Sequence, residues 1–219
     1  MVTFDQIAHN ESIKTYIRKA DDALRVLGYT EHSFAHVTKV AGKAREILLT
    51  LGYPERTAEL AQIAGYLHDI GNVINRADHA QSGAVMAFRI LDKLGADAED
   101  TATIISAIGN HDEGTAVAVD AVAAALILAD KTDVRRSRVR NRDMATFDIH
   151  DRVNYAVEEA STEIASDKSA ITLRIRIDTA SASVMDYFEI FLQRMLLCRK
   201  AAERLGLRFG LVINDQVVL

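Results

Sequence analysis

The chain of 219 residues has a single cysteine, a single proline and no apolar run of membrane-spanning length. The lone Cys198 excludes an internal disulfide framework and suits a reducing cytosol. The apolar run from Ala121 to Ala129 is short and ends in charge, whereas a spanning helix needs about 20 apolar residues. The first residues contain no basic segment followed by an apolar one, so no signal peptide is evident. We therefore expect a cytoplasmic protein that does not enter a membrane.

The chain also lacks an excess of positive charge, because its formal net charge is -5. This balance argues against broad nucleic-acid binding, and no stable complex with nucleic acid is expected. It does not exclude a small anionic substrate at a locally positive site. Apolar residues make up 49% of the chain, which is enough for a sizeable core in one large domain or in a main domain with an appendage.

The first two thirds of the sequence have the apolar spacing of amphipathic helices. Glycine-containing turns separate these segments, and the single proline, Pro54, falls at a predicted first helical turn, where its missing donor does no harm. The spacing predicts helices near residues 11–27, 33–51, 55–69, 78–94, 98–110 and 119–136.

The pattern changes after about Arg152. Residues 171–178 alternate with period two, as in a half-buried strand, and residues 153–165 are expected to pair with them. A long helix near 182–205 and a strand at 209–213 follow, so the tail is predicted to be β-β-α-β with an antiparallel sheet. The fold class is mainly α, with a helical domain at 1–148 and a C-terminal α+β subdomain at 149–219. Because a short sheet leaves open edges, a homodimer formed partly through this tail is predicted.

The adjacent pair His68 and Asp69 is the most informative feature of the sequence. Neighbouring residues on a helix point about 100° apart, so both can face one metal ion only where a helix ends or distorts. Gly71 is expected to provide such an end through the left-handed conformation. Similar residues lie along the chain on both sides of the pair. The full candidate set is His36, His68, Asp69, His79, His111 and Asp130.

Histidine and carboxylate ligands together suit first-row divalent ions such as Mn, Fe, Co, Ni or Zn. They match Mg²⁺ or Ca²⁺ less well, because those ions favour oxygen ligands. A histidine on a helix is more often a surface or hydrogen-bonded residue, and this is expected of His9, His32 and His150. His32 lies four residues before His36 and could share its helical face, and Asp112 beside His111 competes as a ligand.

In the order His…His-Asp…His…His…Asp, this set resembles the HD-domain superfamily of metal-dependent phosphohydrolases. The resemblance covers roughly residues 30–135 and rests on three segments. Residues 36–41 look like the first histidine helix of the family, residues 67–71 are close to the motif that names it, and residues 128–131 are similar to its closing aspartate segment. The ordered combination is far more specific than any one motif.

The resemblance implies a binuclear centre that binds one or two divalent transition-metal ions. One site would be formed by His36, His68, Asp69 and Asp130, and a second by His79 and His111, with Asp69 as a bridge. A hydroxide activated by metal would then cleave a phosphoester bond of a nucleotide or another small phosphorylated substrate.

A dense basic run follows directly after Asp130. Lys131, Arg135 and Arg136 are its candidate phosphate-binding residues, because an arginine fork binds phosphate bidentately and lysine offers a compact charge. Pairing with neighbouring acids such as Asp133, or exposure to solvent, is the alternative for these arginines. A helix would spread them around its axis, so not all of them can point into one pocket.

Departures from named subfamilies narrow the substrate by exclusion. Asn72 stands where many relatives place a lysine, no Gly-Tyr-Pro follows His111, and the acidic pair of guanosine-tetraphosphate hydrolases is missing. Two rivals to a phosphohydrolase remain open. One is a di-iron oxygenase with the same ligand order, and the other is a degenerate HD module that binds a nucleotide or partner.

Overall fold

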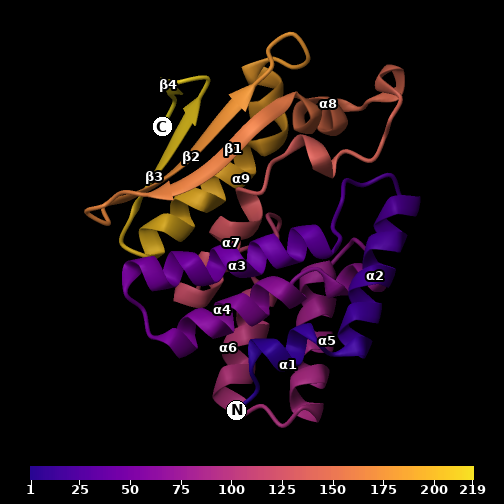
Figure 1. Ribbon diagram of the computed structural model, residues 1–219, viewed down its shortest axis with the longest axis vertical. Helices are drawn as coiled ribbons and strands as arrows, with labels where there is room; N and C mark the ends of the chain where they lie inside the picture. The colour runs from indigo at the N-terminus through magenta and orange to yellow at the C-terminus, as the bar shows by residue number, and fades with distance from the viewer.

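The computed structural model describes all residues from 1 to 219 (Figure 1). A bundle of helices carries a small four-stranded sheet at the C-terminal end of the chain, as the sequence predicted. The helical part consists of α1 (Phe4–Ala8), α2 (Glu11–Val26), α3 (Phe34–Leu51), α4 (Glu55–Leu67), α5 (His79–Lys93), α6 (Ala98–Gly109) and α7 (Ala121–Lys131), with short 3-10 helices η1 (Ile70–Val73), η2 (Arg136–Arg138) and η3 (Met144–Thr146).

Polar residues at the start of these helices explain where they begin. The side chains of Asn10, Ser33, Asp97 and Asp120 each accept a hydrogen bond from a backbone N–H of the first helical turn. Such caps satisfy donors that have no partner within the helix. The predicted helices are confirmed, except that the one expected at 119–136 is shorter and ends at Lys131.

Helix α7 lies at the centre of the molecule. Every residue from Val122 to Lys131 is buried, because α3, α4, α6 and α9 (Val184–Arg204) pack around it. A helix that is apolar on all sides is stable only in such a position. The last two residues of α7, Asp130 and Lys131, are therefore carried into the interior.

The C-terminal part places α9 between the sheet and α7 (Figure 1). Its strands are β1 (Val157–Ile164), β2 (Ala170–Ile177), β3 (Arg208–Ile213) and β4 (Gln216–Val217), in the order β1-β2-β3-β4. In β2 the residues at 171, 173, 175 and 177 are buried, whereas Arg174 and Arg176 are exposed. The period-two alternation thus gives the sheet one face packed on α9 and one face in solvent.

Two features of the tail differ from the prediction. The sheet is mixed, because β3 pairs with β2 in parallel after α9 returns the chain to the same end of the sheet. Residues Ile149–Ala156 form a helix, α8, instead of the start of β1. The Asp148 side chain caps this helix at the amide of Asp151, and the buried Val153 and Ala156 lie three residues apart, which is helical spacing.

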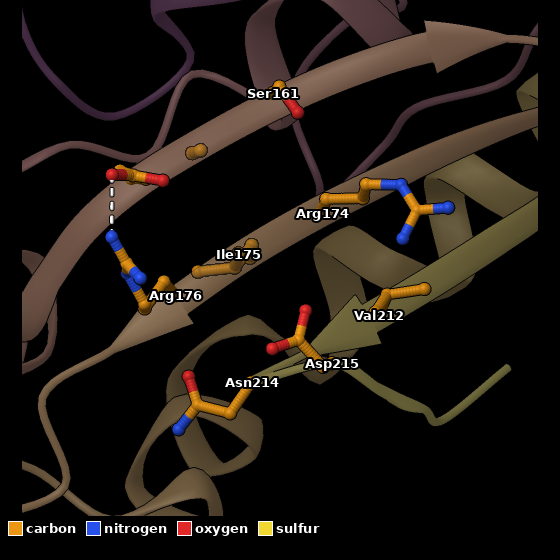
Figure 2. Close-up of a pocket in the computed structure, with 9 residues that line it drawn as sticks. Ser161, Arg174, Ile175, Arg176, Val212, Asn214 and Asp215 are labelled. Atoms are coloured by element: carbon orange, nitrogen blue, oxygen red, sulfur yellow. Dashed lines mark hydrogen bonds and ion pairs between the residues drawn. The ribbon is translucent and has the colours of Figure 1, made fainter.

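The solvent-facing side of the sheet carries a shallow cavity of 240 Å³ over β1, β2 and β3 (Figure 2). Its arginines have acidic neighbours on β1: Arg176 donates to Glu159 at 2.7 Å, and Arg174 lies 3.5 Å from Glu163. These are exposed cross-strand pairs of the kind that stabilise a sheet surface, and they form no cluster of metal ligands. The outer edge of β1 is unpaired, as the dimer prediction assumed, and the dimer itself stays a prediction.

The buried apolar core is continuous from Val2 to Ile213 and crosses the predicted boundary at 148/149. The division into two domains therefore stays a prediction. No helix is both long enough and apolar enough to cross a membrane.

Gly71 has a different role from the one expected. Its φ is not positive, so it does not end α4 in the left-handed conformation. The reason for a glycine is space, since a Cβ at this position would overlap the carbonyl oxygen of His79 and the amide nitrogen of Gly83. The missing side chain lets α5 pack directly on η1. This contact brings the start of α5 close to the end of α4.

We predict that Gly71→Ala lowers the free energy of unfolding by about 3 kcal/mol, because α5 must move away from η1 to make room for the methyl group. Chemical denaturation measures this change. Gly42→Ala is the matched control, since a Cβ there meets nothing within 4 Å on an exposed face of α3, and it should stabilise the protein by about 0.5–1 kcal/mol. Equal effects of the two substitutions would contradict this account of Gly71.

Candidate metal centre

The structure brings all six predicted ligand residues into one buried cluster. They come from the first turn of α3, the end of α4, the first residue of α5, the turn after α6 and the end of α7. None is more than 8% exposed. The members are His36, His68, Asp69, His79, His111 and Asp130, which we call the metal-ligand cluster.

The two carboxylates are close to two imidazole nitrogens at one end of the metal-ligand cluster. His36 Nε2 lies 3.6 Å from Asp69 Oδ2 and 3.3 Å from Asp130 Oδ1. His68 Nε2 lies 3.1 Å and 3.7 Å from the same two oxygens. Ligand atoms of His36, His68 and Asp130 all lie within 4.8 Å of one another, close enough to hold one ion.

The second oxygen of Asp69 faces another histidine. Asp69 Oδ1 lies 3.6 Å from His79 Nε2, on the side of the carboxylate away from His36. Ligand atoms of His68, Asp69 and His111 form a second group within 4.8 Å. The His111 ring lies 5.0 Å from the His68 ring and 5.1 Å from the His79 ring, so His111 stands between the two ends. This arrangement is compatible with a bridging role for Asp69.

Each histidine of the metal-ligand cluster is oriented by its other ring nitrogen. The Nδ1 atoms of His68, His79 and His111 contact the carbonyl oxygens of Gly65, Arg76 and Ile108 at 2.8, 3.1 and 2.6 Å. His36 Nδ1 contacts Asp133 Oδ2 at 2.8 Å. All four acceptors are oxygens, so each Nδ1 must donate and each Nε2 points into the cluster, where that of His79 also accepts from Arg76 Nη1 at 3.3 Å. Metal-binding histidines are commonly held in this way.

Several buried atoms of the metal-ligand cluster have no hydrogen-bond partner. They are His36 Nε2, His68 Nε2 and Asp69 Oδ2. A polar atom left unpaired in the interior costs free energy, and a cation would offset that cost. The hollow beside them is lined by Asp69, His79, His111 and Asp130 among others, and its volume of only 10 Å³ suits an ion or a water molecule and excludes an organic group. The donor set therefore fits a divalent transition-metal ion.

The protonation states also suit metal binding. Burial lowers the pKa of His111 to about 3, helped by positive charge on His68 and Lys131. Although burial acts to raise the pKa of Asp130, the neighbouring Lys131 holds it well below its usual range. At neutral pH His111 therefore keeps a lone pair and Asp130 keeps its charge, as metal ligands must.

Lys131 belongs to a chain of charged groups that runs from the centre to the C-terminal part. Its Nζ lies 2.7 Å from Asp130 Oδ2 and 3.3 Å from Glu113 Oε2. Glu113 Oε1 in turn lies 2.5 Å from Arg194 Nε on α9. Lys131 is only 5% exposed and lines the hollow, which is the position expected of a group that contacts an anion at the centre.

The other predicted phosphate-binding residues lie outside the hollow. Arg135 contacts Glu31 at 3.0 Å and Asp133 at 3.1 Å, and Arg136 lies over the Tyr155 ring at 4.6 Å. Their positions do not support contact with substrate. The hollow is lined instead by Arg76, Arg138 and Arg194.

Arg138, Glu113 and Arg194 differ in how well they could be predicted from the sequence. Arg138 was part of the basic run, and η2 turns its guanidinium inward, where it donates to the carbonyls of Glu31 and Asp133 at 3.0 Å each. Glu113 was signalled only by its nearness to His111. Arg194 had no sequence signal, because α9 reaches the centre through tertiary packing alone.

Two further residues contact the metal-ligand cluster. His32 lines the hollow, with its ring 5.6 Å from that of His36 and its Nδ1 2.7 Å from the Thr30 carbonyl oxygen. Asp112 is 31% exposed and lies 3.8 Å from His79 Nε2, so it is a neighbour of the second end. His9 and His150 are exposed, as predicted.

Comparison with known proteins places the chain in a family. Residues 33–163 match the family model of the HD domain, and the chain belongs to this family. It is 25% identical over 210 residues to an uncharacterized protein of Methanocaldococcus jannaschii, covering 85% of this chain and 79% of that protein. It is also similar to the crystal structure of a predicted HD superfamily hydrolase from an uncultured Thermotogales bacterium, with 27% identity, a TM-score of 0.46 and coverage of 60% of this chain and 72% of the other. Family membership and the His/Asp cluster together support a metal-dependent hydrolase in general terms.

We predict that Asp133→Ala lowers the free energy of unfolding by about 3 kcal/mol, because it leaves buried His36 without its partner and removes the acceptor of Lys39 at 2.7 Å. Although burial acts to raise the pKa of Asp133, contacts with His36 and the neighbouring cations hold it below its usual range. A carboxylate whose pKa is lower in the folded than in the unfolded protein stabilises the fold at any pH above its unfolded pKa. The loss of stability in Asp133→Ala should therefore be complete above about pH 4 and should shrink below it.

Urea denaturation at several pH values measures this deficit. Asp22→Ala is the control, because Asp22 is 47% exposed and its loss should change stability by less than about 0.5 kcal/mol. A deficit that grows in acid would disprove the stated role of the Asp133 charge.

Proposed function

We propose that this protein uses one or two divalent transition-metal ions to hydrolyse a phosphoester bond of a small phosphorylated substrate, with nucleotides among the candidates. The observation that carries the proposal is the position of Asp69, whose two oxygens face His36 and His68 on one side and His79 on the other. Two ions joined by one carboxylate are the usual arrangement for stabilising both the attacking and the leaving oxygen of phosphoryl transfer.

The residues fall into two sets in this proposal. His36, His68, Asp69 and Asp130 would hold one ion, and His79 with His111 would complete the position of a second, with Asp69 shared. Bound divalent ions would polarise the phosphoryl group and lower the pKa of water from about 15.7 towards 7. No separate protein base is then required for the reaction.

The cations around the hollow are proposed to bind the phosphate group of the substrate. Lys131, Arg138 and Arg194 would bind phosphate oxygens and balance the negative charge that the transition state gathers there. Lys131 is positioned for this by Asp130 and Glu113, which hold its ammonium group between them. Lys131 and Arg138 are each only 5% exposed, and shielding from bulk water strengthens their contacts.

A di-iron oxygenase would use the same ligand residues. The lysine and three arginines that line the hollow favour an anionic substrate, and this charge is the reason for preferring phosphoester hydrolysis. A degenerate binding module is disfavoured by the complete ligand set. Metal analysis and substrate screening separate the three possibilities.

We predict that the wild-type protein binds one or two transition-metal ions per chain after reconstitution with Mn²⁺, Fe²⁺, Co²⁺, Ni²⁺ or Zn²⁺. Asp69→Ala should remove both ions if the carboxylate bridges them, whereas His79→Ala should remove mainly one. Elemental analysis of the purified variants measures the metal content. His9→Ala is the control, because His9 is exposed and is not a member of the metal-ligand cluster. Wild-type protein that holds no metal after all five reconstitutions would sink the proposal.

We predict phosphate release from phosphomonoesters, phosphodiesters or nucleotide pyrophosphates in a broad screen with each reconstituted metal. Activity should disappear in Asp69→Ala and after chelation. Lys131→Ala should raise KM through weaker phosphate binding while metal content stays near normal. Metal loss in Lys131→Ala would instead assign Lys131 to the support of Asp130. No release with any metal, together with oxygen consumption by the iron form, would favour the oxygenase.

A further inference from the structure

A second cavity, of 390 Å³, adjoins the metal-ligand cluster. It shares four lining residues with the hollow, namely His32, Arg76, Arg138 and Arg194. The shared residues show that the cavity meets the metal centre at one end. Since the hollow itself has room only for an ion or a water molecule, the cavity is where the organic part of a substrate can lie. We call it the substrate cavity.

The end of the substrate cavity next to the metal centre is positively charged. Its three arginines are the residues shared with the hollow, so they lie where a phosphate would meet the metal ions. Arg138 is 5% exposed, and only its Nε and Nη1 donate to protein carbonyls. Its Nη2 keeps its donors for a ligand, and a buried guanidinium with unused donors is a strong anion contact.

Apolar groups also line the substrate cavity. They are Leu27, Tyr29 and Phe191, and none of them lines the metal hollow. Arg76 lies over the Tyr29 ring and Arg194 over the Phe191 ring, at 5.6 and 4.8 Å from the ring centroids. The arginines are thus held in place by ring stacking as well as by their polar contacts. These apolar groups suit a short hydrocarbon spacer.

Away from the hollow, the substrate cavity carries acidic groups from the N-terminal part of α8. Asp148 and Asp151 line the cavity there with His150 and Asn154, and none of the four lines the hollow. Neither carboxylate forms an ion pair with a protein cation: Asp148 accepts from the amide of Asp151, and Asp151 accepts from the Asn141 side chain at 3.4 Å. Burial and the nearby Asp148 charge raise the pKa of Asp151. Two neighbouring carboxylates that form no ion pair favour a positively charged ligand group.

We propose that the substrate cavity selects phosphomonoesters whose alcohol part carries an amine, with the phosphate at the arginines and the ammonium group at Asp148 and Asp151. This inference rests on the proposed phosphoester hydrolysis and specifies its substrate class. A second phosphate or a carboxylate in place of the ammonium group is disfavoured, because it would lie against the two acidic side chains. The selecting residues come from α8 and α9, so the C-terminal part sets specificity for a centre that the helical bundle builds.

The test compares three series of phosphomonoesters of equal chain length, from two to six carbons, ending in an amine, a methyl group or a carboxylate. The wild-type holoenzyme should hydrolyse the best aminoalkyl phosphate with a kcat/KM about tenfold or more above that of the matched carboxyalkyl phosphate. Asp148→Asn/Asp151→Asn should reduce this ratio about twofold to fivefold, which is the size expected for a partly exposed charge pair. The kcat/KM for the methyl-ended series should stay near that of the wild type.

Asparagine keeps the cap at the start of α8, so the double variant should fold normally. Asp143→Asn is the matched control, because Asp143 is an exposed cap of η3 outside the substrate cavity and should leave the ratio unchanged. Equal hydrolysis of amine and carboxylate substrates by the wild type would overturn the inference. An amine preference of undiminished size in the double variant would overturn it as well.

Binding measurements keep this inference separate from the proposed function. Non-hydrolysable aminoalkyl and carboxyalkyl phosphonates are titrated calorimetrically into the wild-type protein and the double variant. Suppose that the aminoalkyl phosphonates bind more tightly, that this depends on Asp148 and Asp151, and that no substrate is hydrolysed. This result would support the amine-binding role of the cavity and contradict the proposed hydrolase function. Hydrolysis together with equal binding of both phosphonates would sustain the hydrolase and reject the amine.

Discussion

The buried Asp69 carboxylate is the group around which the structure is organised. Its two oxygens face different histidines, and the Asn72 side chain donates to Oδ1 at 2.9 Å. A buried charge of this kind is costly without partners. The end of α4, the turn of η1 and the start of α5 supply those partners, and α5 reaches its place only because Gly71 leaves room for the His79 backbone.

A chain of charges extends from this centre to the C-terminal part. Asp130, Lys131, Glu113 and Arg194 contact one another in that order and lie on α7, the turn after α6, and α9. Burial acts to raise the pKa of Glu113, but the two cations hold it at about 2, so the carboxylate stays charged between them. Removing one member would leave a buried charge unpaired, which costs more than the pair contributes. The helical bundle and the tail are therefore coupled at the candidate centre.

Local patterns predicted most of the helices, β2 and the six members of the metal-ligand cluster. Apolar spacing and capping residues act within a few positions of the chain, so they can be seen without tertiary structure. The expectations that were wrong depended on long-range packing. β3 runs parallel to β2 because α9 crosses between them, α8 replaces the start of β1, and Gly71 serves close packing instead of a left-handed turn. Phosphate binding by Arg135 and Arg136 stays a prediction, and the sequence could not show that only Arg138 of the three lines the hollow, because the direction of each side chain depends on η2.

By itself the sequence determined the chemistry that is available: imidazoles, carboxylates and cations in an order typical of HD-domain proteins, on helices with definite ends. Only the tertiary structure decided which of these groups meet. Because the helices pack around α7, each histidine Nδ1 contacts an oxygen and Arg138 points inward. The same packing brings Arg194 on α9 to the centre. The physical reason is that residue type is a local property of the chain, whereas distance and burial are set by elements that lie far apart in the sequence.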